Sequence, residues 1–300
     1  MQLNMIFNIS YRRVIALLVL GLGMALAPSV AQANPRPLPF TYPTETLAEG
    51  ATEVELYTDM TPLRVLADPA DDTKRIWEPY YMLQTEFEYG ITDRWELGLY
   101  QVFEGLPLDG GGNRFSFDWL KARLRTRLAE PGQWPIDVGL YFEVAGMHDE
   151  LELEGKILLS RRFGRLRVMS NLWVEEEWER PWEDRPIRKA PAFIINPTFG
   201  ATYQIGTRVQ LGAEYWARGK LFGGDANDTP PGADATTAEA ARIARRNDDV
   251  HHFLGPTLHY NLGRAWVSVG VYAHLNDSNK PQPGEIYGPF WLRTVLGVDL

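Results

Sequence analysis

The stretch Leu120-Lys121-Ala122-Arg123-Leu124-Arg125-Thr126-Arg127-Leu128 alternates uncharged residues with basic ones. Successive side chains of a β-strand point to opposite faces, so the four basic residues share one face of a predicted strand. A soluble protein would pack the uncharged face in its core, whereas a membrane barrel would turn that face to lipid. Because an arginine or lysine at the midplane costs a barrel about 2–4 kcal/mol, the basic face of a membrane barrel must point inward.

The start of the chain favours the membrane interpretation, because residues 1–33 have the pattern of a secretory signal. Arg12 and Arg13 precede an apolar stretch over residues 14–26, and residues 29–33 end in an A-x-A-like site. We expect cleavage after Ala33. No apolar run of about 18 residues follows, so we expect no membrane helix. Since the chain contains no cysteine, we expect neither a lipoprotein nor a disulfide framework.

The composition fits an exported β protein. The chain has 13 Tyr, 13 Phe, 10 Trp and 27 Gly, and its formal net charge of -9 argues against a nucleic-acid partner. A mean hydropathy of -0.27 excludes a helical membrane protein. It does not exclude a barrel, in which only every second strand residue must be apolar.

The remaining chain divides into two parts. Residues 34–50 hold four prolines and predict an extended periplasmic segment. Residues 51–300 predict a single antiparallel up-and-down transmembrane β-barrel of the all-β class. We expect about twelve strands, near residues 52–59, 80–89, 94–104, 115–129, 134–147, 151–162, 165–177, 192–204, 208–220, 251–262, 264–275 and 289–300. Pro197 and Pro256 fall inside two of these ranges, and we expect both strands to begin near the proline.

The connections between these strands indicate an orientation. Short glycine-centred connections alternate with longer ones at 60–79, 105–114, 178–191, 221–250 and 276–288, with a short exception near His148. Outer-membrane barrels have short periplasmic turns and long outer loops, so both mature termini are expected in the periplasm. The 221–250 connection has the composition of a short helix and is expected to be a solvated loop, with a gate as the alternative.

Aromatic residues recur beside the short turns and predict an interfacial girdle. They are Tyr89, Trp95, Trp134, Phe163, Tyr203, Tyr260 and Trp266.

Two segments resemble known barrels. The last strand, near 290–300, resembles the C-terminal strand that the barrel-assembly machinery reads in Gram-negative outer-membrane barrels. That family usually ends in Phe or Trp, whereas this chain ends in Leu300. The run Glu86-Phe87-Glu88-Tyr89-Gly90-Ile91-Thr92-Asp93-Arg94-Trp95-Glu96-Leu97-Gly98 resembles the strand-turn-strand unit of phenol-degradation MetA-pathway or transporter-like barrels. The resemblance implies an outer-membrane barrel in contact with lipid and identifies no solute.

Face assignment by alternation predicts a charged lumen. The residues expected to line it and to set any selectivity are Lys121, Arg123, Arg125, Arg127, Asp137, Glu143, Arg167 and Glu175. The basic row could guide anionic solutes, as rows of charge do in pores. The alternative is internal pairing with carboxylates such as Asp137 and Glu143. Twelve strands lie between the packed interior of eight and the open channel of sixteen or more, so both alternatives stay open.

Three functions follow from these features. The first is a narrow channel or transporter for small solutes. The second is a closed structural or surface-binding barrel that acts through its outer loops, with Trp178 and Trp182 in the 178–191 loop as candidates. The third is a lipid hydrolase using His259 and Ser268, which adjacent strands would bring together without an evident acidic residue. The chain is expected not to be an enzyme and to use no cofactor. It is also expected to hold no metal, because the candidate pair His251 and His252 would point to opposite faces of a strand.

Overall fold

The computed structural model describes residues 36–146, 150–179, 192–222, 249–276 and 285–300. That part of the chain contains no helix that is long and apolar enough to cross a membrane. The strands are β1 (Thr52–Asp68), β2 (Asp71–Thr92), β3 (Trp95–Pro107), β4 (Asn113–Arg127), β5 (Asp137–Gly146), β6 (Glu150–Phe163), β7 (Leu166–Glu179), β8 (Ala192–Ile195), β9 (Thr198–Ile205), β10 (Val209–Phe222), β11 (His251–Asn261), β12 (Ala265–His274) and β13 (Phe290–Asp299).

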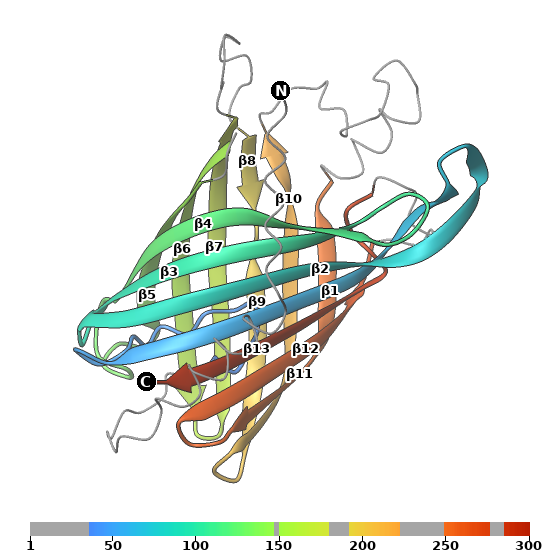
Figure 1. The fold of residues 1–300 in the computed structure, drawn as a ribbon. Coiled ribbons are helices and arrows are strands. Elements are labelled where there is room, and N and C mark those ends of the chain that lie inside the picture. The colour runs from blue at the N-terminus through green and yellow to red at the C-terminus, as the bar shows by residue number, and fades with distance from the viewer. Residues whose placement is uncertain (1–35, 147–149, 180–191, 223–248, 277–284) are drawn as a thin grey trace.

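These strands close into one antiparallel β-barrel with twelve positions around its wall (Figure 1). Each strand pairs with its sequence neighbours, and β13 returns to pair with β1 from Glu53↔Asp299 to Met60↔Leu292. The exceptions are β8 and β9, which do not pair with each other. They share one position in the wall, because each pairs with both β7 and β10. In the described residues, closure leaves open edges at strand tips, for example along the tips of β1 and β2, which extend beyond their other neighbours. The predicted fold class and strand number are confirmed.

The two faces of the wall are reversed relative to a soluble protein. Along β1 the inward residues are polar or charged over most of the strand, beginning with Glu53, Glu55 and Tyr57. On β4 the alternation is the predicted one: Arg123 and Arg125 are buried, whereas Leu124 on the opposite face is exposed. Large apolar side chains are exposed all around the wall, as a barrel in contact with lipid requires.

The predicted girdle is largely outward. Tyr89, Trp95, Trp134, Phe163 and Tyr203 are exposed beside short turns. The prediction that Trp266 belongs to the girdle is wrong. Its side chain is completely buried and donates a hydrogen bond from Nε1 to Glu53 Oε1 at 2.5 Å. Its position in the alternation of β12 turns it inward, and Gly297 on β13 leaves room for its ring.

Two of the predicted long connections are wrong. Residues 60–79 form no loop, because β1 and β2 continue to a turn at Pro69 and Ala70 (Figure 1). Pro62 and Pro79 suggest a break in the sequence, but they lie opposite each other in the ladder. The 105–114 connection shrinks to residues 108–112, where three consecutive glycines have positive φ.

The two prolines behave differently. Pro197 interrupts one wall position, so that β8 ends at Ile195 and β9 begins at Thr198. Pro256 lies inside β11, opposite Ala213 of β10, so the prediction that this strand begins at the proline is wrong. The ladder between β11 and β12 instead skips Gly255 and Pro256, because proline lacks the N–H that the ladder needs. The predicted signal at 1–33, most of the 178–191 and 221–250 loops, and His148 lie outside the described residues.

Candidate functional site: the barrel lumen

The basic row of β4 is paired internally. Arg123, only 1% exposed, contacts three carboxylates on β2 and β3. Its Nε lies 2.6 Å from Glu86 Oε1 and its Nη1 lies 2.6 Å from Glu96 Oε1, while Nη2 donates to Glu88. Arg125 Nη2 lies 2.7 Å from the same Glu96 Oε1. Three buried carboxylates therefore enclose two guanidinium groups at the short-turn end of the lumen.

A glycine makes this network possible. Gly98 of β3 lies opposite Arg123 in the ladder, and a Cβ there would be 2.6 Å from Arg123 Nε and 2.7 Å from Glu86 Oε1. A Cβ atom essentially never approaches another heavy atom so closely. The guanidinium therefore crosses the space that a side chain on β3 would otherwise fill.

The two ends of the row have separate partners. Lys121 Nζ lies 3.1 Å from Glu143 Oε1, so Glu143, named in the internal-pairing alternative, pairs with this end of the row. Arg127 instead pairs with Glu130 in the adjoining turn at 3.0 Å. Asp137, the other carboxylate named in that alternative, accepts a hydrogen bond from Gly132 N at 2.6 Å. It stabilises the short turn that precedes its own strand.

The lumen also contains a segment of the chain itself. Residues 36–48, called the lumen segment below, form neither helix nor strand and are buried almost throughout. They are visible as a blue coil in the lower part of the barrel (Figure 1). The segment contacts β10, β7 and β3, which lie at different positions around the wall. Residues 36–48 were expected in the periplasm. That location is wrong, because the segment lies inside the barrel, where buried carboxylates and an amide of the wall form hydrogen bonds with its backbone.

These backbone contacts are specific. Glu214 Oε1 of β10 accepts hydrogen bonds from Phe40 N at 3.0 Å and Thr41 N at 2.6 Å. Asn171 of β7 accepts from Tyr42 N at 2.7 Å and donates to Tyr42 O at 3.0 Å. A segment without regular structure must find partners for its backbone when it is buried, and the wall supplies them.

Further contacts hold the end of the segment nearest the short turns. Leu47 N donates to Glu96 Oε2 at 2.7 Å, which links the segment to the Arg125 network. Arg167 of β7 donates to Glu45 and, at 3.0 Å, to Ser160. Burial of Glu45 opposes ionisation, but the charge and hydrogen bond of Arg167 outweigh it and lower the pKa of this carboxyl. The predicted lumen residue Arg167 thus fastens the lumen segment.

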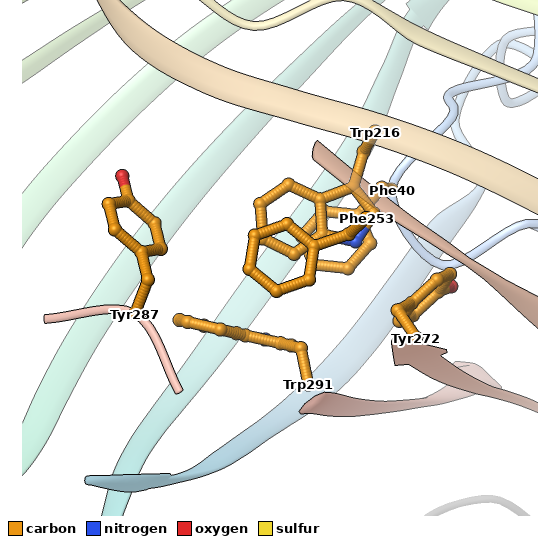
Figure 2. Close-up of a cluster of buried hydrophobic side chains, with 6 residues drawn as sticks. All are labelled: Phe40, Trp216, Phe253, Tyr272, Tyr287 and Trp291. Atoms are coloured by element: carbon orange, nitrogen blue, oxygen red, sulfur yellow. The ribbon is translucent and has the colours of Figure 1, made fainter. Parts of the chain in front are cut away.

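A cavity of about 370 Å³ lies toward the opposite end of the barrel. Phe40 and Tyr42 of the lumen segment belong to its lining, and so does the predicted residue Glu175. Eleven aromatic, seven acidic and five basic side chains line it in total. Four of the lining residues, Phe40, Trp216, Tyr287 and Trp291, belong to the aromatic cluster in Figure 2, which also contains Phe253 and Tyr272.

The aromatic rings of the lumen surround cations of the chain. Lys156 Nζ lies 3.6 Å from the ring centroid of Trp173, 4.0 Å from that of Tyr141 and 4.4 Å from that of Tyr42. Glu154 Oε1 completes this surrounding at 2.7 Å. The Arg293 guanidinium similarly lies 3.8 Å from the ring centroid of Phe40. Such contacts are favourable because the ring face is electronegative.

Several carboxylates lie close enough together to hold a cation. The groups are Glu55, Glu86 and Glu88; Glu143, Glu152 and Glu154; and Glu152, Glu175 and Glu177. Each group already contacts a basic side chain of the barrel, for example Arg123, Lys121 or Arg218. Lysine and arginine therefore supply the positive charge that these carboxylates require.

The hydrolase pair is close, but its geometry does not suit lipid hydrolysis. His259 Nδ1 lies 2.8 Å from Ser268 Oγ, as their places on adjacent strands predicted. However, Ser268 Oγ donates to Arg36 O at 2.5 Å, and both side chains are at most 1% exposed inside the barrel. Within the described chain, His259 Nε2 has no hydrogen-bond partner, so no carboxylate orients this imidazole. The pair therefore forms part of the anchorage of the lumen segment.

Comparisons with known proteins support the fold. No family model matches the chain, so the MetA-pathway resemblance is not confirmed, and no curated protein matches it. The NanC porin structure has a TM-score of 0.52 and 9% identity, with 82% of this chain and 100% of that chain covered. An outer membrane channel from Pseudomonas putida F1 has a TM-score of 0.53 and 13% identity, with 90% of this chain and 100% of that chain covered. These chains share the barrel architecture at identities that show the fold alone.

Sequence reasoning missed the lumen segment and the aromatic lining. The four prolines fit a segment without helix or strand but carried no information about its location. One available signal was the density of Phe40 and Tyr42 among those prolines, since large apolar side chains are seldom left in solvent. The inward aromatic residues were hidden because aromatic residues favour strands on either face.

Proposed function

We propose that this protein is an outer-membrane channel for small solutes, closed by the lumen segment in the conformation of this structure. The observation that carries the proposal is the reversed patterning of the wall, with charge inside and apolar side chains outside. A protein with this surface would aggregate in water, whereas a bilayer covers it. The short turns and the C-terminal strand would face the periplasm, where the barrel-assembly machinery would read that strand.

The closure follows from where the barrel is filled. The Arg123 network and the Leu47 end of the lumen segment lie at the end with the short turns. Phe40 and Tyr42 of the same segment line the cavity, which extends toward the other end of the lumen. A solute that entered the cavity would therefore meet the lumen segment before it reached the periplasm. Movement of that segment is the step that would connect the two sides.

Planar-bilayer recording tests this function. The mature chain should show small or rare conductance steps, and a variant that lacks residues 36–47 should show larger and longer ones. Circular dichroism would verify that the deletion variant retains its β structure. A full-length Glu214→Ala variant provides a second route, because it removes the acceptor of Phe40 N and Thr41 N without shortening the chain.

The same recording decides the alternative function, a closed barrel that acts through its outer loops. The observation that favours this alternative is that all four residues of the basic row, Lys121, Arg123, Arg125 and Arg127, are paired with carboxylates of the chain. If both variants keep their β structure and show no conductance, the channel proposal is wrong and the closed barrel remains.

A further inference from the structure

We propose that the lumen cavity binds a small organic cation, namely an ammonium group attached to an apolar body, at Glu175 and Asn196. This proposal rests on the proposed function, because the cation would be the solute that the channel admits. Binding can be measured without conduction, so the two proposals can fail separately.

The first observation is a pair of buried acceptors without partners. Glu175 of β7 is 1% exposed, and Asn196, between β8 and β9, is 4% exposed; both line the cavity. Glu175 Oε1 lies 2.5 Å from Arg218 Nη1, whereas Glu175 Oε2 and Asn196 Oδ1 have no hydrogen-bond partner among the described residues. A buried acceptor without a donor costs about 1–3 kcal/mol, so each calls for a donor.

The fold brings these two acceptors together. Asn196 N donates to Trp173 O at 2.9 Å, which fixes Asn196 beside β7 two positions from Glu175. On the other side Ala217 N donates to Pro197 O, next to Arg218 of β10. The break at Pro197 thus sets Asn196 between two continuous strands. Because the terminal torsion of a glutamate has a broad minimum, the unpaired oxygen can turn toward the cavity that Glu175 lines.

The second observation is the charge of the cavity. Seven carboxylates and five basic side chains line it. Two of the basic residues have carboxylate partners outside this lining: Arg293 pairs with Asp59 and Arg36 lies 3.8 Å from Glu55. By formal charge, the lining therefore contains more acidic than basic groups. In a region of low dielectric constant this excess attracts a cationic solute and repels an anion.

The third observation is that aromatic rings of this lumen already accept cations. Trp173 and Tyr141 contact the Lys156 ammonium at 3.6 and 4.0 Å from their ring centroids. The same kind of wall would surround the apolar body and charge of a ligand. The indole N–H groups of Trp173 and Trp216 lack partners among the described residues, and a hydroxyl on the ligand or a water molecule would accept from them.

The experiment compares three probes of one shape and different charge. Benzylammonium, benzyl alcohol and benzoate are titrated into the full mature chain in detergent micelles, and binding is measured by calorimetry. Benzylammonium should bind at least about tenfold more tightly than the other two, because one charge-assisted hydrogen bond contributes about that factor. Equal binding of benzoate, or no binding of benzylammonium, would overturn the proposal.

Two substitutions with opposite expected effects locate the site. Glu175→Gln should weaken benzylammonium binding about tenfold, and Asn196→Asp should tighten it several-fold by adding a negative charge. Glu130→Gln is the matched control, because this exposed carboxylate lies in a short turn outside the cavity lining. A loss of folding would weaken binding in both site variants, so tighter binding by Asn196→Asp distinguishes the site from general damage. If both site variants bind like the parent, the site is not at these residues.

Discussion

Removing the Glu214 carboxylate should release the lumen segment. Glu214 is completely buried, accepts from Phe40 N at 3.0 Å and Thr41 N at 2.6 Å, and is absent from the lining of the cavity. Each hydrogen bond to a charged group contributes about 1.5–3 kcal/mol, so Glu214→Ala should destabilise the seated segment by roughly 3–6 kcal/mol. At about 1.4 kcal/mol per tenfold, the unseated population should rise by roughly 10²- to 10⁴-fold.

A thiol-labelling assay measures this population directly. The chain contains no cysteine, so Thr44→Cys introduces a single thiol at a position that is 3% exposed in the lumen segment. A membrane-impermeant maleimide labels that thiol only when the segment leaves its site, and the labelling rate follows the unseated fraction.

Two further variants make the comparison specific. Glu214→Gln keeps an acceptor oxygen and should raise the labelling rate much less than Glu214→Ala. Glu130→Gln removes a carboxylate that pairs with Arg94 in an exposed turn, and should leave the rate unchanged. If the Glu214→Ala rate equals that of the parent, the two backbone hydrogen bonds do not hold the segment and the reasoning is refuted.

Three other outcomes follow from the same contacts. Gly98→Ala should lower the stability by about 1–3 kcal/mol, because a Cβ would lie 2.6 Å from Arg123 Nε; an unchanged urea midpoint would contradict this. The lowered pKa of Glu45 means that its contact with Arg167 stabilises the seated segment above the unfolded pKa of about 4.3 and is lost as pH falls through the lower, folded value. Relative to the rate for the same chain unfolded at each pH, which corrects for the falling thiolate fraction, labelling of the introduced thiol should therefore accelerate below about pH 4. Glu45→Gln should accelerate it at pH 7 and abolish that acid step; a pH-independent relative rate in the parent would exclude this tether. Leu140→Lys, on an outward position that is 42% exposed, should cost about 2–4 kcal/mol when the barrel refolds into liposomes, and full refolding yield would argue against lipid contact there.

The closed network around Arg123 changes the expected role of the basic row. A row that guides anions would leave its charges facing water, whereas Arg123 contacts three carboxylates and is 1% exposed. Removing one member of a buried ionic group costs about 3–5 kcal/mol, because the remaining charges lose their partner. The row therefore has the geometry of a cross-link between β2, β3 and β4.

The sequence alone determined the strands and their faces. The two-residue period around Arg123, with uncharged residues between the basic residues, defines a strand and the side that must avoid lipid. This information is local, because neighbouring side chains alternate whatever the rest of the chain does. It failed where local signals mislead, as at Pro62 and Pro79, which remain within long strands. It also could not show that Trp266, which was predicted to belong to the outward girdle, points into the barrel.

Only the tertiary structure decided what fills the barrel. Phe40 and Thr41 bond to Glu214, at sequence separations of 174 and 173 residues. Arg123 likewise reaches Glu86 across 37 residues, and no periodicity specifies which of several inward carboxylates it will meet. These partners depend on barrel closure and strand register, which bring distant positions to the same level of the lumen. The buried backbone N–H groups of the lumen segment need acceptors, and they donate to the carboxylates that closure places beside them.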